Sequence, residues 1–133
     1  MADIKISYCV ALHNILTKIL FDYDKDGKLL ERKLPFNVKY KLQKNLNIVS
    51  KDFLFFETER NNLIKKYGEE KEDKIKLKEE NFEDYKSEVE KLLDMEVSRN
   101  LLKLSDEEVE AIGDVEADCA EMEVFIEYLT DKE

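Results

Sequence analysis

Three aspartates at alternating positions, Asp22, Asp24 and Asp26, are followed at once by Gly27 in the stretch DYDKDGKLLERK. Carboxylate oxygens at loop positions 1, 3 and 5, with glycine at position 6, match the first half of a calcium-binding loop. The three aspartates are therefore candidate metal ligands, and calcium is the ion that their spacing suggests.

The second half of this stretch does not continue the calcium pattern. Position 12, where a calcium loop has a bidentate glutamate, is Lys33, whose ammonium group would face the cation. Pro35 stands where the exit helix should already run, and proline removes a helical amide. An Asp-Gly pair flanked by apolar residues is also a strong hairpin-turn signal that needs no metal. We therefore expect a plain turn, with calcium binding as the alternative.

Other reactive side chains are few and dispersed. Cys9 and Cys119 lie at opposite ends of the chain inside apolar helical patterns, which favours buried thiols over a disulfide. His13 is the single histidine, so a histidine-based triad or a multi-histidine metal centre is excluded. No glycine-rich phosphate loop, Cys-x-x-Cys, His-Glu-x-x-His or Gly-x-Ser-x-Gly motif occurs. The sequence therefore predicts a protein without catalytic activity or cofactor.

Composition sets the fold class. The chain has 133 residues, 41% of them charged, and only three glycines and one proline. So few glycines and prolines argue against an all-β fold, which needs many turns. The composition instead predicts a mainly helical α+β protein that forms one domain, residues 1–133. No apolar run approaches 18 residues, and the N-terminus lacks the basic-then-apolar layout of a secretion signal. We therefore expect a cytoplasmic protein.

Charge is distributed unevenly along the chain. Residues 1–68 contain 13 Lys/Arg and 8 Asp/Glu, whereas residues 69–133 contain 9 and 24. Residues 105–131 contain 11 acidic residues and no lysine or arginine. Such a surface repels nucleic acids and anionic membranes and attracts a basic protein surface. The alternative is that these charges only keep the protein soluble. The candidate partner-binding residues are Asp106, Glu107, Glu110, Glu116 and Glu123.

Residues 37–67 are expected to form the longest element, a helix. Apolar residues recur there at spacings of three and four over more than three heptads, broken once at Arg60. A helix of about 30 residues is roughly 45 Å long at 1.5 Å per residue, more than a compact domain of this size covers. We therefore expect this helix to protrude or to pair.

The middle of that helix is apolar around almost its whole circumference, in the run Phe-Leu-Phe-Phe at residues 53–56. One side should pack internally, and the other should meet a second helix or a second chain. An ordinary core helix with a wide apolar face is the alternative. The candidate oligomer-interface residues are Val49, Phe53, Phe56 and Leu63.

Shorter elements flank the long helix. Ile4 and Ile6 indicate a short strand, and Ser7 caps a helix whose apolar residues continue to residue 20. After the long helix, residues 69–74 read as a charged loop and residues 75–77 as an edge strand.

The C-terminal third is expected to be helical apart from one strand. Asn81 caps a helix, and residues 95–104 suggest a second strand. A capping box that starts at Ser105 opens a short helix ending at Gly113, and Asp114 starts the last helix. The expected apolar face of that last helix is Val115, Cys119, Met122, Phe125, Ile126 and Leu129.

Three pieces of the sequence stand in a distinctive order: KLPFNVKYKLQKNLNIVSKDFLFFETERNNLIKKYGEE, then IKLKEENFEDYKSEVEKLLDMEV, then KLSDEEVEAI. This order resembles a family of short uncharacterised proteins encoded by phages and prophages of Gram-positive bacteria. The resemblance covers residues 34–129 and implies a protein acting in the cytoplasm of the host cell. It implies no chemistry and no site residues, and the aspartate-rich turn lies outside it.

Two functions follow as hypotheses. The first is an interaction protein that inhibits a host defence or nucleic-acid enzyme through its acidic surface, without contacting nucleic acid directly. The second is a virion or assembly component that works as a homo-oligomer through the long helix. A small-ligand sponge would need clustered arginines, but Arg32, Arg60 and Arg99 lie far apart in the sequence.

Overall fold

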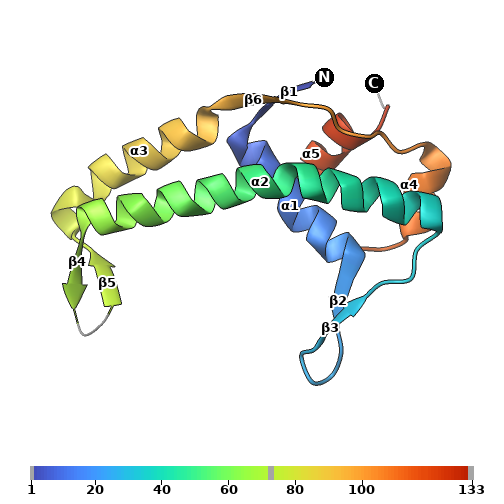
Figure 1. The fold of residues 1–133 in the computed structure, drawn as a ribbon, viewed down its shortest axis with the longest axis horizontal. Helices are drawn as coiled ribbons and strands as arrows, with labels where there is room; N and C mark the ends of the chain where they lie inside the picture. Colours follow the sequence, from blue (N-terminus) through green and yellow to red (C-terminus); the bar gives the residue numbers. More distant parts are fainter. Residues whose placement is uncertain (1, 72–73, 132–133) are drawn as a thin grey trace.

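The structure, a computed structural model, describes residues 2–71 and 74–131. It has the mainly helical α+β fold that the composition predicted, with one long helix and small antiparallel sheets (Figure 1). The elements in chain order are β1 (Ala2–Lys5), α1 (Ile6–Leu20), β2 (Phe21–Tyr23), β3 (Leu29–Glu31), α2 (Phe36–Tyr67), β4 (Gly68–Lys71), β5 (Lys74–Leu77), the 3-10 helix η1 (Glu79–Asn81), α3 (Phe82–Asp94), β6 (Glu96–Arg99), α4 (Asp106–Ile112) and α5 (Cys119–Leu129).

Helix α2 is the longest element of the fold, and helices α1 and α3 pack against it. Its 32 residues give a length of about 48 Å at 1.5 Å per residue. Helix α1 packs along its N-terminal half, and α3 turns back after the β4–β5 hairpin to pack along its C-terminal half (Figure 1). The long helix therefore both pairs and protrudes, and its pairing partners belong to the same chain.

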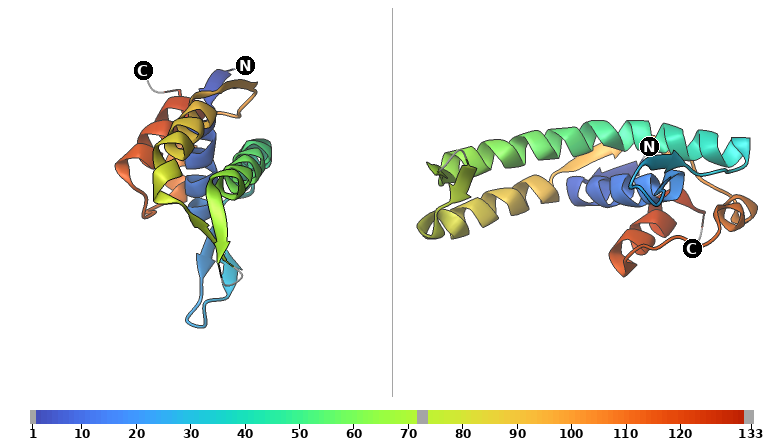
Figure 2. Two further views of the ribbon diagram at one scale, coloured as in Figure 1. Left: turned by 90° about the vertical axis from the view of Figure 1, so that its left-hand side faces the viewer. Right: turned by 90° about the horizontal axis from the view of Figure 1, so that it is seen from below.

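Helix α1 lies at the centre of the fold, between α2 and α5 (Figure 2). Its sequence, ISYCVALHNILTKIL, contains a single lysine, Lys18, and no acidic residue, so it can be covered on several sides at little cost in desolvated charge. The core forms where the apolar faces of α1, α2 and α5 meet. Its most buried side chains include Cys9, Leu12, Leu16, Leu20, Leu42, Val49, Leu104 and Leu129.

The described strands form three two-stranded antiparallel sheets, which lie at the ends of helices. Strand β1 pairs with β6, which places Ile4 opposite Val97 and connects the start of the chain to the segment after α3. Strands β2 and β3 form a hairpin whose turn contains Gly27 at φ +80°, a conformation that favours glycine. The plain turn predicted for the aspartate-rich stretch is thus confirmed. An isolated parallel bridge joins Leu104 to Thr130.

Residues 69–74 were expected to be a loop, but residues 69–71 belong to β4 and Lys74 begins β5, while residues 72–73 lie outside the described part of the chain. In the β4–β5 register Glu69 lies opposite Lys76, so one charge of the expected loop has an oppositely charged residue across the hairpin. Gly68 begins this hairpin tight against α2. A Cβ atom at Gly68 would lie 2.6 Å from the carbonyl oxygen of Ile64, which only glycine avoids.

The strand expected over residues 95–104 is shorter, because regular pairing ends with β6 at residue 99. After residue 99, a side chain of α2 supplies the hydrogen bonds that a neighbouring strand would make. The fully buried Asn45 donates from Nδ2 to the Leu102 carbonyl at 2.8 Å and accepts from the Leu102 amide at 2.8 Å. One amide side chain on α2 therefore fixes the extended segment that leads to α4.

The last helix begins later than expected. A capping box at Ser105 and a helix end at Gly113 are confirmed, but α5 starts at Cys119 rather than at Asp114. Asp118 is its N-cap, and its side chain accepts from the Glu121 amide at 2.7 Å. The sequence Asp-Cys-Ala-Glu carries that capping signal and was overlooked.

The buried face of α5 also differs from the expected one. The helix buries Val124, Phe125 and Leu129, and leaves Cys119, Met122 and Ile126 exposed. The prediction of a buried thiol is therefore confirmed for Cys9 and wrong for Cys119.

The last third of α2 (residues 57–67), the β4–β5 hairpin and α3 form an arm, described over residues 57–71 and 74–94 (Figure 1). No described side chain of the arm is buried, although apolar residues of α2 and α3 are half-buried where the two helices meet. The core of the molecule lies entirely outside the arm, around α1.

Candidate functional site

The acidic region, residues 105–131, covers α4, α5 and the connection between them. Nine of its eleven acidic side chains are exposed. The exceptions are Glu108 and Glu121, which are buried and form ion pairs with lysines of other helices. The region thus divides its carboxylates between two that attach it to the core and nine that face solvent.

Glu108 attaches α4 to α2. Its Oε1 accepts from Lys41 Nζ at 2.7 Å and from the Ser105 amide at 2.9 Å, and its Oε2 accepts from Asn37 Nδ2 at 3.1 Å. The hydrogen bond from Lys41, followed by those from Ser105, holds the pKa of Glu108 below its ordinary value. The side chain therefore serves at once as a helix cap and as an interhelical ion pair.

Glu121 attaches α5 to α1. Its Oε1 accepts from Lys18 Nζ at 2.7 Å and from the Asp118 amide at 3.2 Å. Its Oε2 is covered, and no hydrogen-bond donor in the described part of the chain reaches it. A buried acceptor without a donor costs about 1–3 kcal/mol, and among the described side chains only His13 Nδ1 is likewise buried without a hydrogen-bond partner.

The five predicted partner-binding residues are all exposed, and none makes an ion pair with a described residue. Asp106, Glu107 and Glu110 lie within the first five residues of α4. Glu116 lies in the α4–α5 connection, and Glu123 lies on α5. The structure therefore distributes them over three consecutive segments of one region, with only the three on α4 as immediate neighbours.

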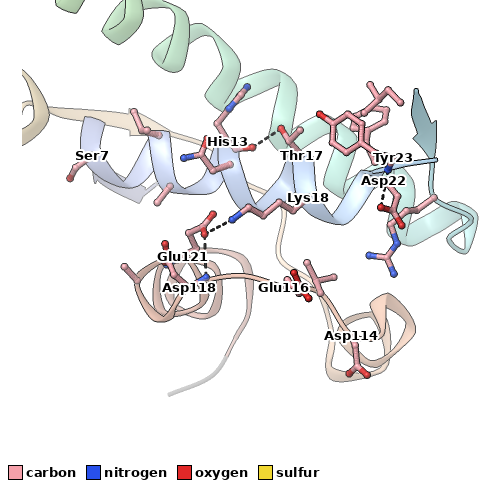
Figure 3. A pocket seen from close by; sticks show the side chains of 18 residues that line it. Ser7, His13, Thr17, Lys18, Asp22, Tyr23, Asp114, Glu116, Asp118 and Glu121 are labelled. Atoms are coloured by element: carbon pink, nitrogen blue, oxygen red, sulfur yellow. Dashed lines mark hydrogen bonds and ion pairs between the residues drawn. The ribbon is translucent and has the colours of Figure 1, made fainter. Parts of the chain in front are cut away.

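A groove of about 1100 Å³ runs along α1 and brings residues of the acidic region to face the β2–β3 hairpin (Figure 3). Helix α1 forms one wall, from Ser7 to Lys18, and the other wall is the α4–α5 connection with the start of α5. The hairpin closes one end with Tyr23 and Leu29, which are 68% and 50% exposed. Of the predicted partner-binding residues, Glu116 alone lines it.

The lining of the groove has an excess of negative charge, because five carboxylates face two cations and both cations are engaged. Lys18 pairs with Glu121, and Arg32 donates to the backbone carbonyls of Ile19 and Ile112 at 3.3 and 3.2 Å. The five carboxylates are Asp22, Asp114, Glu116, Asp118 and Glu121. Sequence reasoning did not connect Asp22 with the acidic region, since nothing local indicates that the hairpin and the connection meet.

The aspartates proposed as calcium ligands do not converge. Asp24 Oδ1 accepts from the amides of Asp26 and Lys28, at 2.9 and 2.8 Å, and so closes the turn itself. Asp22 Oδ1 accepts from the neighbouring Tyr23 amide. Within the described residues no group of three His, Cys, Asp or Glu side chains is placed to hold a metal ion. This corrects the alternative reading of the stretch as a calcium loop.

The buried polar cluster around Cys9 is structural. Asp52 on α2 accepts from Arg99 Nε at 2.9 Å and from Arg99 Nη2 at 2.6 Å, a two-pronged ion pair that connects α2 to β6. Burial, and then the nearby Asp52 carboxylate, raise the pKa of the Cys9 thiol to about 12. A thiol with so high a pKa holds its proton at neutral pH and cannot act as an activated nucleophile.

His13 offers no catalytic arrangement either. Its ring stacks on Phe53 of α2, with 3.8 Å between ring centroids and 6° between planes. Burial lowers its pKa, which favours the neutral form of the imidazole. His13 and Cys9 therefore both pack inside the fold, whereas the second thiol, Cys119, is exposed.

The predicted oligomer-interface residues point inward. Val49 is fully buried and Phe56 is 6% exposed within the single chain, so neither has surface to offer a second chain, which corrects the expectation for these two. Phe53 is half-buried against His13, and Leu63 is half-buried in the arm. The apolar residues that recur along α2 do form a packing surface, but α1 and α3 of the same chain cover it.

No helix among the described residues is both long enough and apolar enough to cross a membrane. Comparisons of the chain with protein-family models, with curated proteins and with solved structures found no match.

Proposed function

We propose that this chain is a non-catalytic phage or prophage protein that acts in the host cytoplasm by binding a basic protein surface. Its target, on this proposal, is a host defence or nucleic-acid enzyme that it inhibits. The single observation that carries the proposal is the exposure of nine carboxylates in a region without lysine or arginine up to residue 131. An excess of charge of one sign speeds association with an oppositely charged surface and repels wrong partners, and of these nine only Asp131 has an ion pair with a described residue, Lys103.

The charge density on α4 is comparable to that of DNA. Asp106, Glu107 and Glu110 lie within about 6 Å along the helix axis at 1.5 Å per residue. That is roughly one charge every 2 Å, against one per about 1.7 Å for double-stranded DNA. A cationic channel that accommodates nucleic acid therefore meets a similar density of negative charge on this helix.

The test is a charge reversal that spares the fold. Glu107→Lys, Glu110→Lys and Glu116→Lys together change exposed side chains that make no described ion pair. Immobilised wild-type protein is expected to retain a basic protein from a Gram-positive host lysate, and to protect a sensitive phage from that host's defence in a plaque assay. The triple variant should lose both effects while its circular dichroism spectrum is unchanged.

A matched control reverses three exposed acids of α3, Glu83, Asp84 and Glu90, so that net charge changes equally. This control should retain the partner and the plaque phenotype, because its changes lie on the arm. If both variants lose the partner equally, net charge alone explains the effect and the acidic region is not the contact. If the triple variant of the acidic region still retains the same partner, the proposal is wrong.

A second candidate function is that of an assembly component working as a homo-oligomer. It is favoured by the arm, in which no described side chain is buried, together with Leu54 and Phe55, which are 64% and 44% exposed on α2. Phe82 on α3 is 48% exposed as well. Light scattering during size-exclusion chromatography at low and high salt measures the mass, and a monomer at high concentration would count against this function.

A further inference from the structure

We propose that the groove along α1 receives an extended, arginine- or lysine-rich peptide segment of the partner protein. This inference rests on the proposed function and names the contact through which that function would operate. The two walls and the β2–β3 hairpin come from segments far apart in the sequence, so the groove exists only in the folded chain (Figure 3).

Charge identifies the chemistry of the occupant. Lys18 and Arg32 are occupied by Glu121 and by backbone carbonyls, which leaves Asp22, Asp114 and Glu116 exposed on the rim without a lysine or arginine partner in the described chain. An occupant with guanidinium or ammonium groups neutralises these carboxylates. An anionic occupant would be repelled by them, and an apolar occupant would remove their water without replacing its hydrogen bonds.

Glu121 supplies an observation independent of the exposed charges. Its side chain is only 7% exposed, it lines the groove from the start of α5, and its Oε2 accepts no hydrogen bond from a described residue. Lys18, its partner, is 47% exposed and lies beside the groove (Figure 3). Lys18 bonds Oε1 and leaves Oε2 unused, so a donor from an incoming side chain would add a hydrogen bond once rotation of the carboxylate exposes Oε2.

The size and the other lining residues favour a peptide over a small cation. At about 1100 Å³ the groove exceeds the usual range of roughly 300–1,000 Å³ for small-molecule pockets. Its wall from Ser7 to Lys18 spans about 17 Å along α1, which an extended chain covers with about five residues at 3.3 Å each. Apolar side chains such as Val10 and Val115 lie among the acids. Alternate residues of an extended peptide could then contact apolar and acidic parts in turn.

The experiment uses the full-length protein and a defined probe. The probe is a fluorescein-labelled, end-blocked seven-residue peptide in which arginine alternates with leucine, and its control replaces each arginine by neutral citrulline. Fluorescence anisotropy is expected to show saturable binding of the arginine peptide that weakens with salt, and binding at least tenfold weaker for the citrulline peptide. Amide shifts in nitrogen-proton NMR spectra are expected on α1, the hairpin and the α4–α5 connection.

Isosteric neutralisation locates the site. Asp22→Asn, Asp114→Asn and Glu116→Gln together remove three rim charges, and binding is expected to weaken about tenfold. Asp106→Asn with Glu107→Gln removes charge from α4 outside the groove and is expected to change binding less than twofold. Equal weakening by both sets, or amide shifts confined to α4 or the arm, would overturn the groove as the site.

Two further outcomes separate this inference from the proposed function. If the arginine peptide does not bind while the Glu107, Glu110 and Glu116 reversal still abolishes partner capture, the groove proposal fails and the acidic-surface proposal stands. If spermine binds the groove as tightly as the peptide and competes with it fully, the occupant is a small organic cation and the peptide proposal is wrong.

Discussion

Asn45 offers the sharpest test of how the acidic region is held to the core. Its side chain is fully buried and makes both hydrogen bonds of a strand partner to Leu102, each at 2.8 Å. Asn45→Ala removes two hydrogen bonds worth about 0.5–1.5 kcal/mol each and leaves an amide and a carbonyl of the partly buried Leu102 to find water. We expect the free energy of unfolding to fall by about 2–4 kcal/mol.

Urea unfolding followed by circular dichroism measures this change, with an unchanged m-value showing that the unfolded state is comparable. For a chain of this length the loss corresponds to a melting temperature lower by roughly 10 °C. Hydrogen exchange adds a local readout, because the Leu102 amide should lose protection in the variant even under conditions where the core helices remain protected.

The matched control is Asn47→Ala, the same substitution at an exposed position of the same helix. Asn47 only accepts a side-chain hydrogen bond from Gln43, so its replacement should change the free energy of unfolding by no more than about 0.5 kcal/mol. A loss below about 1 kcal/mol in Asn45→Ala, with the Leu102 amide still protected, would refute the claim that one side chain fixes this segment.

Three further predictions concern single residues. The pKa of Glu108 is lowered in the folded state, so its contribution to stability is complete above its ordinary value of 4.5 and is lost as pH falls through the lower folded-state value. Lys41→Met removes the largest cause of the shift and should reduce this part of an acid-unfolding profile, while the hydrogen bonds from Ser105 retain the rest. Gly68→Ala should destabilise the protein by about 1–3 kcal/mol in urea unfolding, because the added Cβ would lie 2.6 Å from a backbone carbonyl; a neutral effect would show that α2 and the hairpin can separate. Iodoacetamide should alkylate Cys119 rapidly and Cys9 only on unfolding, as mass spectrometry of the folded protein can establish.

Local signals predicted the helices well. The spacing of apolar residues identified α1 and α2, and the Ser105 capping box located the start of α4, because caps and periodicity act within a few residues of the chain. The start of α5 was equally local, since Asp118 caps it through Glu121, but that signal was overlooked.

What could not be predicted depends on contacts between distant segments. Lys18 and Glu121 are 103 residues apart, and Asn45 and Leu102 are 57 apart, so no spacing rule connects them. The heptad seam of α2 was correctly identified as a packing surface, but the sequence does not say which helix covers it. The groove was missed for the same reason, because Asp22 and Glu116 belong to different segments that only the fold brings together.

The central position of α1 has a consequence for synthesis on the ribosome. Helix α1 ends at Leu20, yet its last partner, α5, begins only at Cys119. At translation rates of about 5–20 residues per second, the apolar faces of α1 wait roughly 5–20 s for that partner. During this interval α2 can cover one side only, so the nascent chain exposes an aggregation-prone helix until α5 has been made. Chaperone binding to ribosome-bound chains should therefore be strongest before α5 emerges.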